Sequence, residues 1–201
     1  MRSTPGLAKP LMHVREEVTA VRRQLPDSTV LATPDSLPGV PAPTKAHVLA
    51  ALRDCLIAHF ACHGRTDPNV PTRSQLLLTD HQQSPLIVAD LMTALTGDAQ
   101  LAFLSACRTA DAGTTELIDE AIHLASAFQL ADFPHVIGTL WDLDSEAARD
   151  ITESFYTGLR DSQGHLDPAL APLALHTATR DLRDAYPRSP TLWATHVHVG
   201  P

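Results

Sequence analysis

Four short runs of apolar residues stand out along the chain, and each is apolar at nearly every position. They cover residues 55–62, 101–106, 135–140 and 193–199. Continuous runs of this length are typical of parallel strands that helices cover on both faces. A further short strand is predicted at residues 75–79.

Between these runs, apolar residues recur at the spacing of amphipathic helices. This pattern predicts helices at residues 11–25, 44–53, 117–128, 145–159 and 168–185. Thr44 is the expected N-cap of the second helix, and Asp144 or Ser145 that of the fourth. Strands that alternate with helices of this length predict an α/β fold, a three-layer αβα sandwich around a mostly parallel sheet.

Residues 26–43 interrupt this alternation with five prolines and one glycine. Proline removes a backbone donor and fixes φ, so regular structure is not expected there, apart from a short strand at Thr29–Ala32. The chain is therefore expected to divide into residues 1–43, a helix followed by a proline-rich connector, and a main domain at residues 44–201.

Composition narrows the classes of function. The formal net charge is −8, from 23 acidic and 15 basic residues, and this argues against a nucleic-acid partner, which needs a basic face. No run of eighteen apolar residues predicts a membrane span, and residues 1–13 do not form a secretory signal. An odd number of cysteines, three, fits a reducing cytoplasm better than a disulfide framework.

Several sequence motifs for cofactors and catalysis are missing. The chain has no G-x-G-x-x-G, no P-loop and no G-x-S-x-G, so the sequence supports no nucleotide cofactor and no hydrolase elbow. His59 and His63 are four residues apart, but on a strand their side chains would lie about 13 Å from each other, too far for one ion. We expect no metal site and no cofactor.

The strongest candidates for chemistry follow two of the apolar runs. His63 and Gly64 come directly after the first run, and Cys107 comes directly after the second. In parallel strands of one sheet these residues would meet at the carboxyl edge, where open α/β sheets bind ligands. A nearby imidazole can activate a thiol that is only slightly ionised at neutral pH. The alternative is that Cys107 is a small buried hydrophobe and His63 an ordinary loop residue.

The order and spacing of these residues favour the catalytic interpretation. Cys107 lies 44 residues after His63, close to the gap of about 50 residues in caspases, and Ala106–Arg108 is similar to the caspase motif around the nucleophile. Residues 57–64 (IAHFACHG) and 101–109 (LAFLSACRT) closely resemble the two signature blocks of the CHAT domain. Further blocks resemble it at residues 119–141, 155–156 and 193–200.

The resemblance implies a caspase-like α/β sandwich in which His63 and Cys107 form a catalytic dyad. The function expected from it is a cysteine endopeptidase that cleaves a protein or peptide substrate. Cys107 would attack the scissile carbonyl, His63 would protonate the leaving amine, and the backbone amides of Gly64 and Cys107 would hold the oxyanion. Domains of this kind often occur beside repeat-containing or effector proteins, which are therefore candidate partners.

Four acidic residues are candidates for a substrate pocket that would bind a basic side chain: Asp119, Glu120, Asp142 and Asp144. Helix-capping and surface roles are the alternative for each of them. The chain also departs from the family at Asp132, where the family commonly has glycine. This extra carboxylate is expected at a helix end on the surface.

A second hypothesis is a non-catalytic CHAT-like scaffold that binds a protein partner. CHAT domains usually carry further strands ahead of the region matched here, so residues 1–43 would be the remnant of that upstream part. A sheet without those strands would expose an unpaired edge. The isolated chain is accordingly expected to associate with itself or to be only marginally stable.

Overall fold

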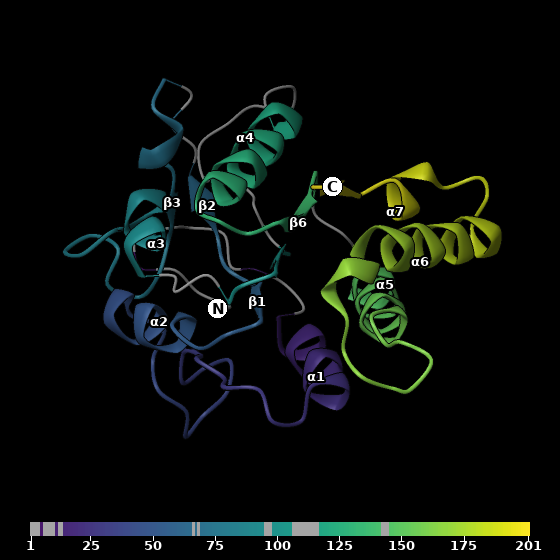
Figure 1. Cartoon of the computed structure of the whole chain (residues 1–201), viewed down its shortest axis with the longest axis horizontal. Coiled ribbons are helices and arrows are strands. Elements are labelled where there is room, and N and C mark those ends of the chain that lie inside the picture. Colours follow the sequence, from purple (N-terminus) through teal and green to yellow (C-terminus); the bar gives the residue numbers. More distant parts are fainter. Residues whose placement is uncertain are drawn as a thin grey trace.

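The computed structural model describes residues 5, 11, 14–65, 67, 69–94, 98–105, 117–141 and 145–201. In this part of the chain, four strands form the central sheet in the order β1-β5-β6-β7. These strands are β1 (Ile57–Phe60), β5 (Leu101–Leu104), β6 (His135–Thr139) and β7 (His196–Val199). Strands β1, β5 and β6 are parallel, and helices lie on both sides of the sheet (Figure 1). The predicted three-layer α/β sandwich with a mostly parallel sheet is confirmed.

Alternate residues of β5 explain why the sequence is apolar at every position of this strand. Leu101 and Phe103 belong to one apolar cluster, and Ala102 and Leu104 belong to the other. All four side chains are fully buried. The strand therefore has no face in water, and the sequence has no polar position to alternate with.

Helices from two parts of the chain cover the two faces. The first face packs against α1 (Val14–Gln24), α5 (Ser145–Gly158) and α6 (Ala171–Ala185). The second face packs against α2 (Lys45–Leu52), α3 (Val88–Ala94) and α4 (Leu117–Leu130). Thr44 caps α2 as predicted, because its hydroxyl accepts a hydrogen bond from the His47 amide at 3.3 Å. In the part of the chain that the structure describes, no helix is long and apolar enough to cross a membrane.

The last strand, β7, differs from the expectation of a parallel strand, because it runs antiparallel to β6. Two helices, α5 and α6, lie between these strands, and the chain reverses between the helices at the bridge of Arg160 with Leu166. One crossover helix returns a chain to the same end of a sheet, whereas a pair of antiparallel helices returns it to the opposite end. A short helix, α7 (Pro190–Trp193), then leads into β7.

A second, small antiparallel sheet follows β1. It consists of β2 (Gly64–Arg65), β3 (Gln75–Leu76) and β4 (Leu86–Ile87). The strand predicted at residues 75–79 is therefore present, but it ends after two residues. Strands of two residues are too short for an alternating pattern, and β2 and β4 were not predicted.

The prediction of a strand at Thr29–Ala32 is wrong. Residues 28–33 have no regular structure, and the Ala32 amide donates a hydrogen bond to the carbonyl of Pro41, inside the same proline-rich segment. Helix α1 precedes this segment and buries Val14, Ala20 and Val21. Val21 belongs to the same apolar cluster as Phe103, so α1 packs into the main core. The expected domain boundary after residue 43 stays a prediction.

Candidate active site

His63 lies where the chain passes from the central sheet to the small one. Strand β1 ends at Phe60, and β2 begins at Gly64. The His63 side chain is buried, with 3% of its surface exposed. Its backbone carbonyl accepts a hydrogen bond from the Leu77 amide at 2.8 Å, so the segment after β1 is fixed by the small sheet.

The register of β1 and β5 defines the edge of the sheet at which the candidate dyad is expected. Phe60 pairs with Leu104, and the Ser105 amide donates to the Phe60 carbonyl at 3.0 Å. His63 and Cys107 each follow the last paired residue of their strand by three positions. Cys107 itself lies outside the described residues. Strands β1 and β5 nevertheless run in the same direction, and their last paired residues lie opposite each other.

Gly64 lies close against α4, and a side chain at this position would have to displace the Leu124 side chain. A Cβ atom there would lie 2.9 Å from Cδ2 of Leu124 on α4. Gly64 pairs with Leu76, and the hydrogen bond of the neighbouring pair, His63 and Leu77, makes Gly64 the non-hydrogen-bonded position of the ladder. Its amide therefore points away from β3, towards the edge of β2 that pairs with no other strand in the described part of the chain.

The other two cysteines are poor nucleophiles. Burial raises the pKa of the Cys62 thiol to about 11. Burial also raises the pKa of Cys55, which is half-buried. Since the thiolate is the reactive form, neither side chain is activated at neutral pH.

A buried polar cluster, made by Glu17, His59 and Tyr156, lies beneath this edge of the sheet and was not found from the sequence. Nε2 of His59 lies 3.1 Å from Oε1 of Glu17, and Nδ1 lies 2.9 Å from the Tyr156 hydroxyl. The His59 ring also stacks on Phe103, with 4.8 Å between ring centroids. Because both ring nitrogens have partners within the protein, His59 is not poised to bind a metal. The sequence contains one indication that Glu17 is buried: this residue shares a helix face with Val14 and Val21, which are buried.

Burial and the neighbouring polar groups act in opposite directions on the pKa of Glu17. Burial tends to raise the pKa of the Glu17 carboxyl, but hydrogen bonds from His59 and Ser105 and the electrostatic interaction with His59 bring it below its usual value. Burial lowers the pKa of His196 to about 4, so that imidazole is neutral at pH 7. Glu17 thus links α1 to His59 on β1 and to Ser105, the residue that directly follows β5.

The acidic residues predicted to line a substrate pocket are not placed by the structure. Asp119 and Glu120 lie on α4, where only the backbone of that part of the helix is described. Asp142 and Asp144 lie outside the described residues. A role in specificity therefore stays a prediction for all four. Among the described residues, no three histidine, cysteine or acidic side chains come together as a metal site would require.

Comparison with known protein families identifies a family for this sequence. The sequence matches the CHAT domain over residues 2–201, the whole chain except its first residue. The match therefore includes α1 and the proline-rich segment as well as both candidate dyad positions. No curated protein matches the chain.

Proposed function

The chain belongs to the CHAT domain family, part of the caspase-like cysteine protease superfamily, and on this premise we propose that it is a cysteine endopeptidase. Cys107 is the nucleophile and His63 the general base and acid. The observation that carries the proposal is the register of β1 with β5, in which both residues follow paired strand ends by three positions. Parallel strand ends of an α/β sheet are where substrates bind.

The proposed hydrolysis of a peptide bond proceeds in two stages, formation of a thioester and its hydrolysis. His63 accepts the proton of the Cys107 thiol, and the thiolate attacks the carbonyl carbon of the scissile peptide bond. His63 then gives the proton to the leaving amine, which departs and leaves a thioester. Water, activated by the same imidazole, hydrolyses the thioester and restores the free thiol.

The backbone amide of Gly64 supports an oxyanion site beside this dyad. It points away from β3 and is not used by the ladder of the small sheet. Amides aimed at the carbonyl oxygen stabilise the charge that develops on it in the transition state, and removing one such donor costs about 10²–10³-fold in rate. The amide of Cys107 is the proposed second donor.

Selective alkylation of the three cysteines tests the dyad without knowledge of the substrate. We expect iodoacetamide at pH 7 to modify Cys107 before Cys55 and Cys62, whose pKa values burial raises. Peptide mapping by mass spectrometry would report the rate at each site. His63→Ala should slow modification of Cys107 alone, whereas His47→Ala, an exposed histidine on α2, is the matched control. Equal or absent modification of Cys107 would favour the non-catalytic scaffold.

Hydrolysis of a fluorogenic peptide library provides the direct test. Cys107→Ala should reduce turnover by about 10⁴-fold or more, because it removes the nucleophile. Its unfolding transition should be unchanged. A variant that still cleaves the substrate at the normal rate would refute the assignment. Peptides with a basic residue before the scissile bond test the four predicted acidic residues at the same time.

A further inference from the structure

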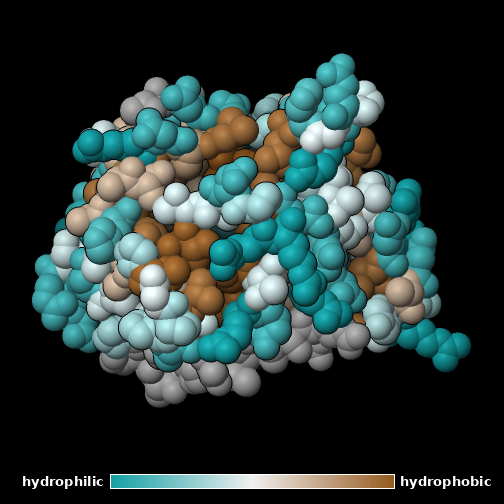
Figure 2. Space-filling view, turned by 90° about the horizontal axis from the view of Figure 1, so that it is seen from below, coloured by the Kyte–Doolittle hydropathy of each residue, from teal (hydrophilic) through white to brown (hydrophobic). Residues whose placement is uncertain are grey.

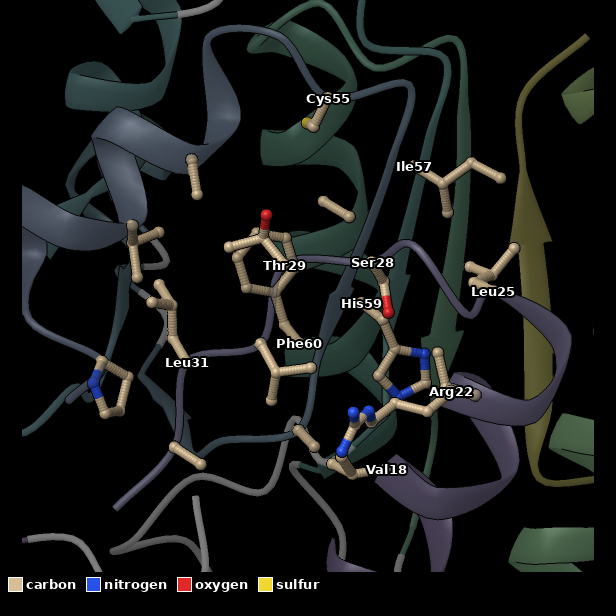
Figure 3. A pocket seen from close by; sticks show the side chains of 18 of the residues that line it. Val18, Arg22, Leu25, Ser28, Thr29, Leu31, Cys55, Ile57, His59 and Phe60 are labelled. Atoms are coloured by element: carbon tan, nitrogen blue, oxygen red, sulfur yellow. The ribbon is translucent and has the colours of Figure 1, made fainter. Parts of the chain in front are cut away.

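Glu17 is a buried acidic residue of α1 whose hydrogen bonds reach the two segments that lead to the candidate dyad. Its Oε1 lies 3.1 Å from Nε2 of His59, and Figure 3 shows the His59 side chain directed from β1 towards α1. The Ser105 side chain also hydrogen-bonds to the Glu17 carboxyl. His59 lies four residues before His63, and Ser105 lies two residues before Cys107. One carboxyl group thus connects the segments that carry both members of the dyad.

The protons of this cluster follow from its hydrogen bonds. The pKa of Glu17 lies below its usual value, so the carboxylate is ionised at neutral pH and can only accept hydrogen bonds. Nε2 of His59 therefore donates to it, and Nδ1 lies 2.9 Å from the Tyr156 hydroxyl. Burial keeps the pKa of Tyr156 well above its usual value of 10, so this hydroxyl retains its proton. The His59 ring is thus held at both nitrogens, and Glu17 is held with it.

Packing alone does not account for an acidic residue at this position of α1. Glu17 shares its helix face with Val14 and Val21, and Val21 belongs to the apolar core. Burial of a carboxylate with its partner costs desolvation, and replacing such a pair by apolar residues is often neutral or stabilising. Hydrogen bonds, unlike apolar contacts, fix both the distance and the direction between two groups. The carboxylate is therefore better suited to aligning two segments than to stabilising α1.

The packing of α1 places Glu17 at the strands that lead to the dyad. The main helix contact of α1 is with α5. A groove on another side of α1 is lined by α1, α2 and β1, and from below apolar atoms are visible in a recess between polar ones (Figure 2). Val21 and Leu25 attach the later part of α1 to the apolar core. Glu17, one turn earlier than Val21, connects α1 to the strands by hydrogen bonds instead.

These contacts give α1 a part in the chemistry of the sheet edge. We propose that Glu17 is a positioning residue, which through His59 and Ser105 fixes the distance between His63 and Cys107. This inference rests on the proposed cysteine endopeptidase and deepens it. An opposite charge shifts a pKa strongly only within about 4–6 Å. A small increase in the separation of the dyad would therefore return the Cys107 thiol to its ordinary pKa of about 8.5.

The pH dependence of Cys107 alkylation by iodoacetamide, followed by peptide mapping on the full chain, tests this role. In the parent protein we expect an apparent pKa at least one pH unit below about 8.5, because the His63 imidazole is close. Glu17→Ala should return this pKa to about 8.5. Glu17→Gln keeps the shape and can hydrogen-bond to both partners, so it should keep the pKa of the parent. An equal effect of the two substitutions would assign the shift to the charge of Glu17 and overturn a positioning role.

Three further variants show whether Glu17 acts through the dyad. In the Glu17→Ala background, His63→Ala should have no further effect on the pKa of Cys107, because residues that act as a unit are not additive. Ser105→Ala removes one of the two hydrogen bonds of Glu17 and should raise the Cys107 pKa in the same direction, which keeps the test open if Glu17→Ala does not fold. Leu175→Ala is the matched control. It removes a buried side chain of α6 from the same core and should destabilise the protein without moving this pKa.

The outcomes separate this proposal from the proposed function. A Cys107 pKa near about 8.5 in the parent protein, unaffected by His63→Ala, would refute the dyad itself. A lowered, His63-dependent pKa that persists in folded Glu17→Ala and in Ser105→Ala would refute the role of Glu17 and leave the dyad standing. A shift in Leu175→Ala as large as that in Glu17→Ala would show that lost stability, rather than lost positioning, moves the pKa.

Discussion

Asp132 ends α4 in a backbone conformation that favours glycine. Its φ is 74°. The Phe133 amide donates to the Phe128 carbonyl, and the Asp132 amide donates to that of Gln129, which together form a Schellman motif. The rings of Phe128 and Phe133 are 5.7 Å apart, which supplies the apolar contact that accompanies the motif. The side chain of Asp132 is exposed at this helix end.

Asp132→Gly should therefore stabilise the protein. Relief of the left-handed strain is worth about 1–2 kcal/mol, and the greater freedom of glycine in the unfolded chain returns part of it. We expect the free energy of unfolding to rise by about 0.5–1 kcal/mol in urea titrations. Asp132→Ala keeps a Cβ but lacks the short polar side chain that makes aspartate tolerant of a positive φ, so it should lower the free energy of unfolding instead. A glycine variant less stable than the parent would show that the aspartate carboxylate makes a compensating contact.

The pKa of His196 makes stability depend on pH. Burial lowers this pKa from 6.5 to about 4, so between these values the unfolded chain binds a proton that the folded chain does not. The contribution of the neutral His196 side chain to stability is therefore fully present above pH 6.5, and it is lost as the pH drops towards 4. A shift of this size corresponds to about 3 kcal/mol. Glu17, with its lowered pKa, adds a loss in the same direction below its usual value of 4.5.

Replacing His196 should remove most of this dependence. Urea titrations of His196→Gln between pH 6.5 and 4 should show a flatter profile than the parent protein. His165→Gln, at an exposed position, is the matched control and should keep the parent profile. Burial also lowers the pKa values of His135 and His198, so a residual slope in the variant is expected. An unchanged profile would show that His196 is protonated in the folded protein.

At the scale of elements, the sequence pattern predicts the strands that helices cover on both faces. The apolar runs form β1, β5 and β6, and nearly all their positions are apolar because alternate residues face the helix layers on opposite sides of the sheet. The direction of β7 depends on how α5 and α6 pack, which no local pattern contains. His63 could be named as a candidate from the sequence because it follows an apolar strand, and its catalytic role stays a prediction. Glu17 and His59 were missed as a pair because their contact joins segments 42 residues apart.

Helix α1 is anchored to β1 by this buried pair, and the anchor can be measured. Glu17→Ala leaves Nε2 of the buried His59 without its hydrogen-bond partner, and an unsatisfied buried polar group costs about 1–3 kcal/mol. Glu17→Gln keeps the shape and can still accept the hydrogen bond, so it should cost less. Glu16→Ala removes an exposed carboxylate from the same turn and should change the free energy of unfolding by about 0.5 kcal/mol or less. Equal stability of the Glu17 and Glu16 variants would show that the pair does not hold α1.

At the scale of the whole molecule, the first helix and the last elements share one core. Val21 of α1 belongs to the same apolar cluster as Leu101 and Phe103 of β5 and Tyr156 of α5. Figure 1 shows α1 beside α5 on one side of the sheet, although the two helices are far apart in the sequence. Elements that share a core unfold together in small proteins. Helix α1 thus contributes to the same cooperative unit as β1 and β5.

Removal of residues 1–43 tests this cooperativity. The chain 44–201 loses the apolar side chains of α1 and leaves His59 without Glu17, so we expect no cooperative thermal transition by circular dichroism. A peptide of residues 11–43, added in trans, should restore the transition, because it supplies the missing layer. If the chain 44–201 melted alone at the midpoint of the full chain, α1 would be an appendage. The boundary predicted after residue 43 would then mark a true domain, and α1 would have no part in holding the ends of β1 and β5.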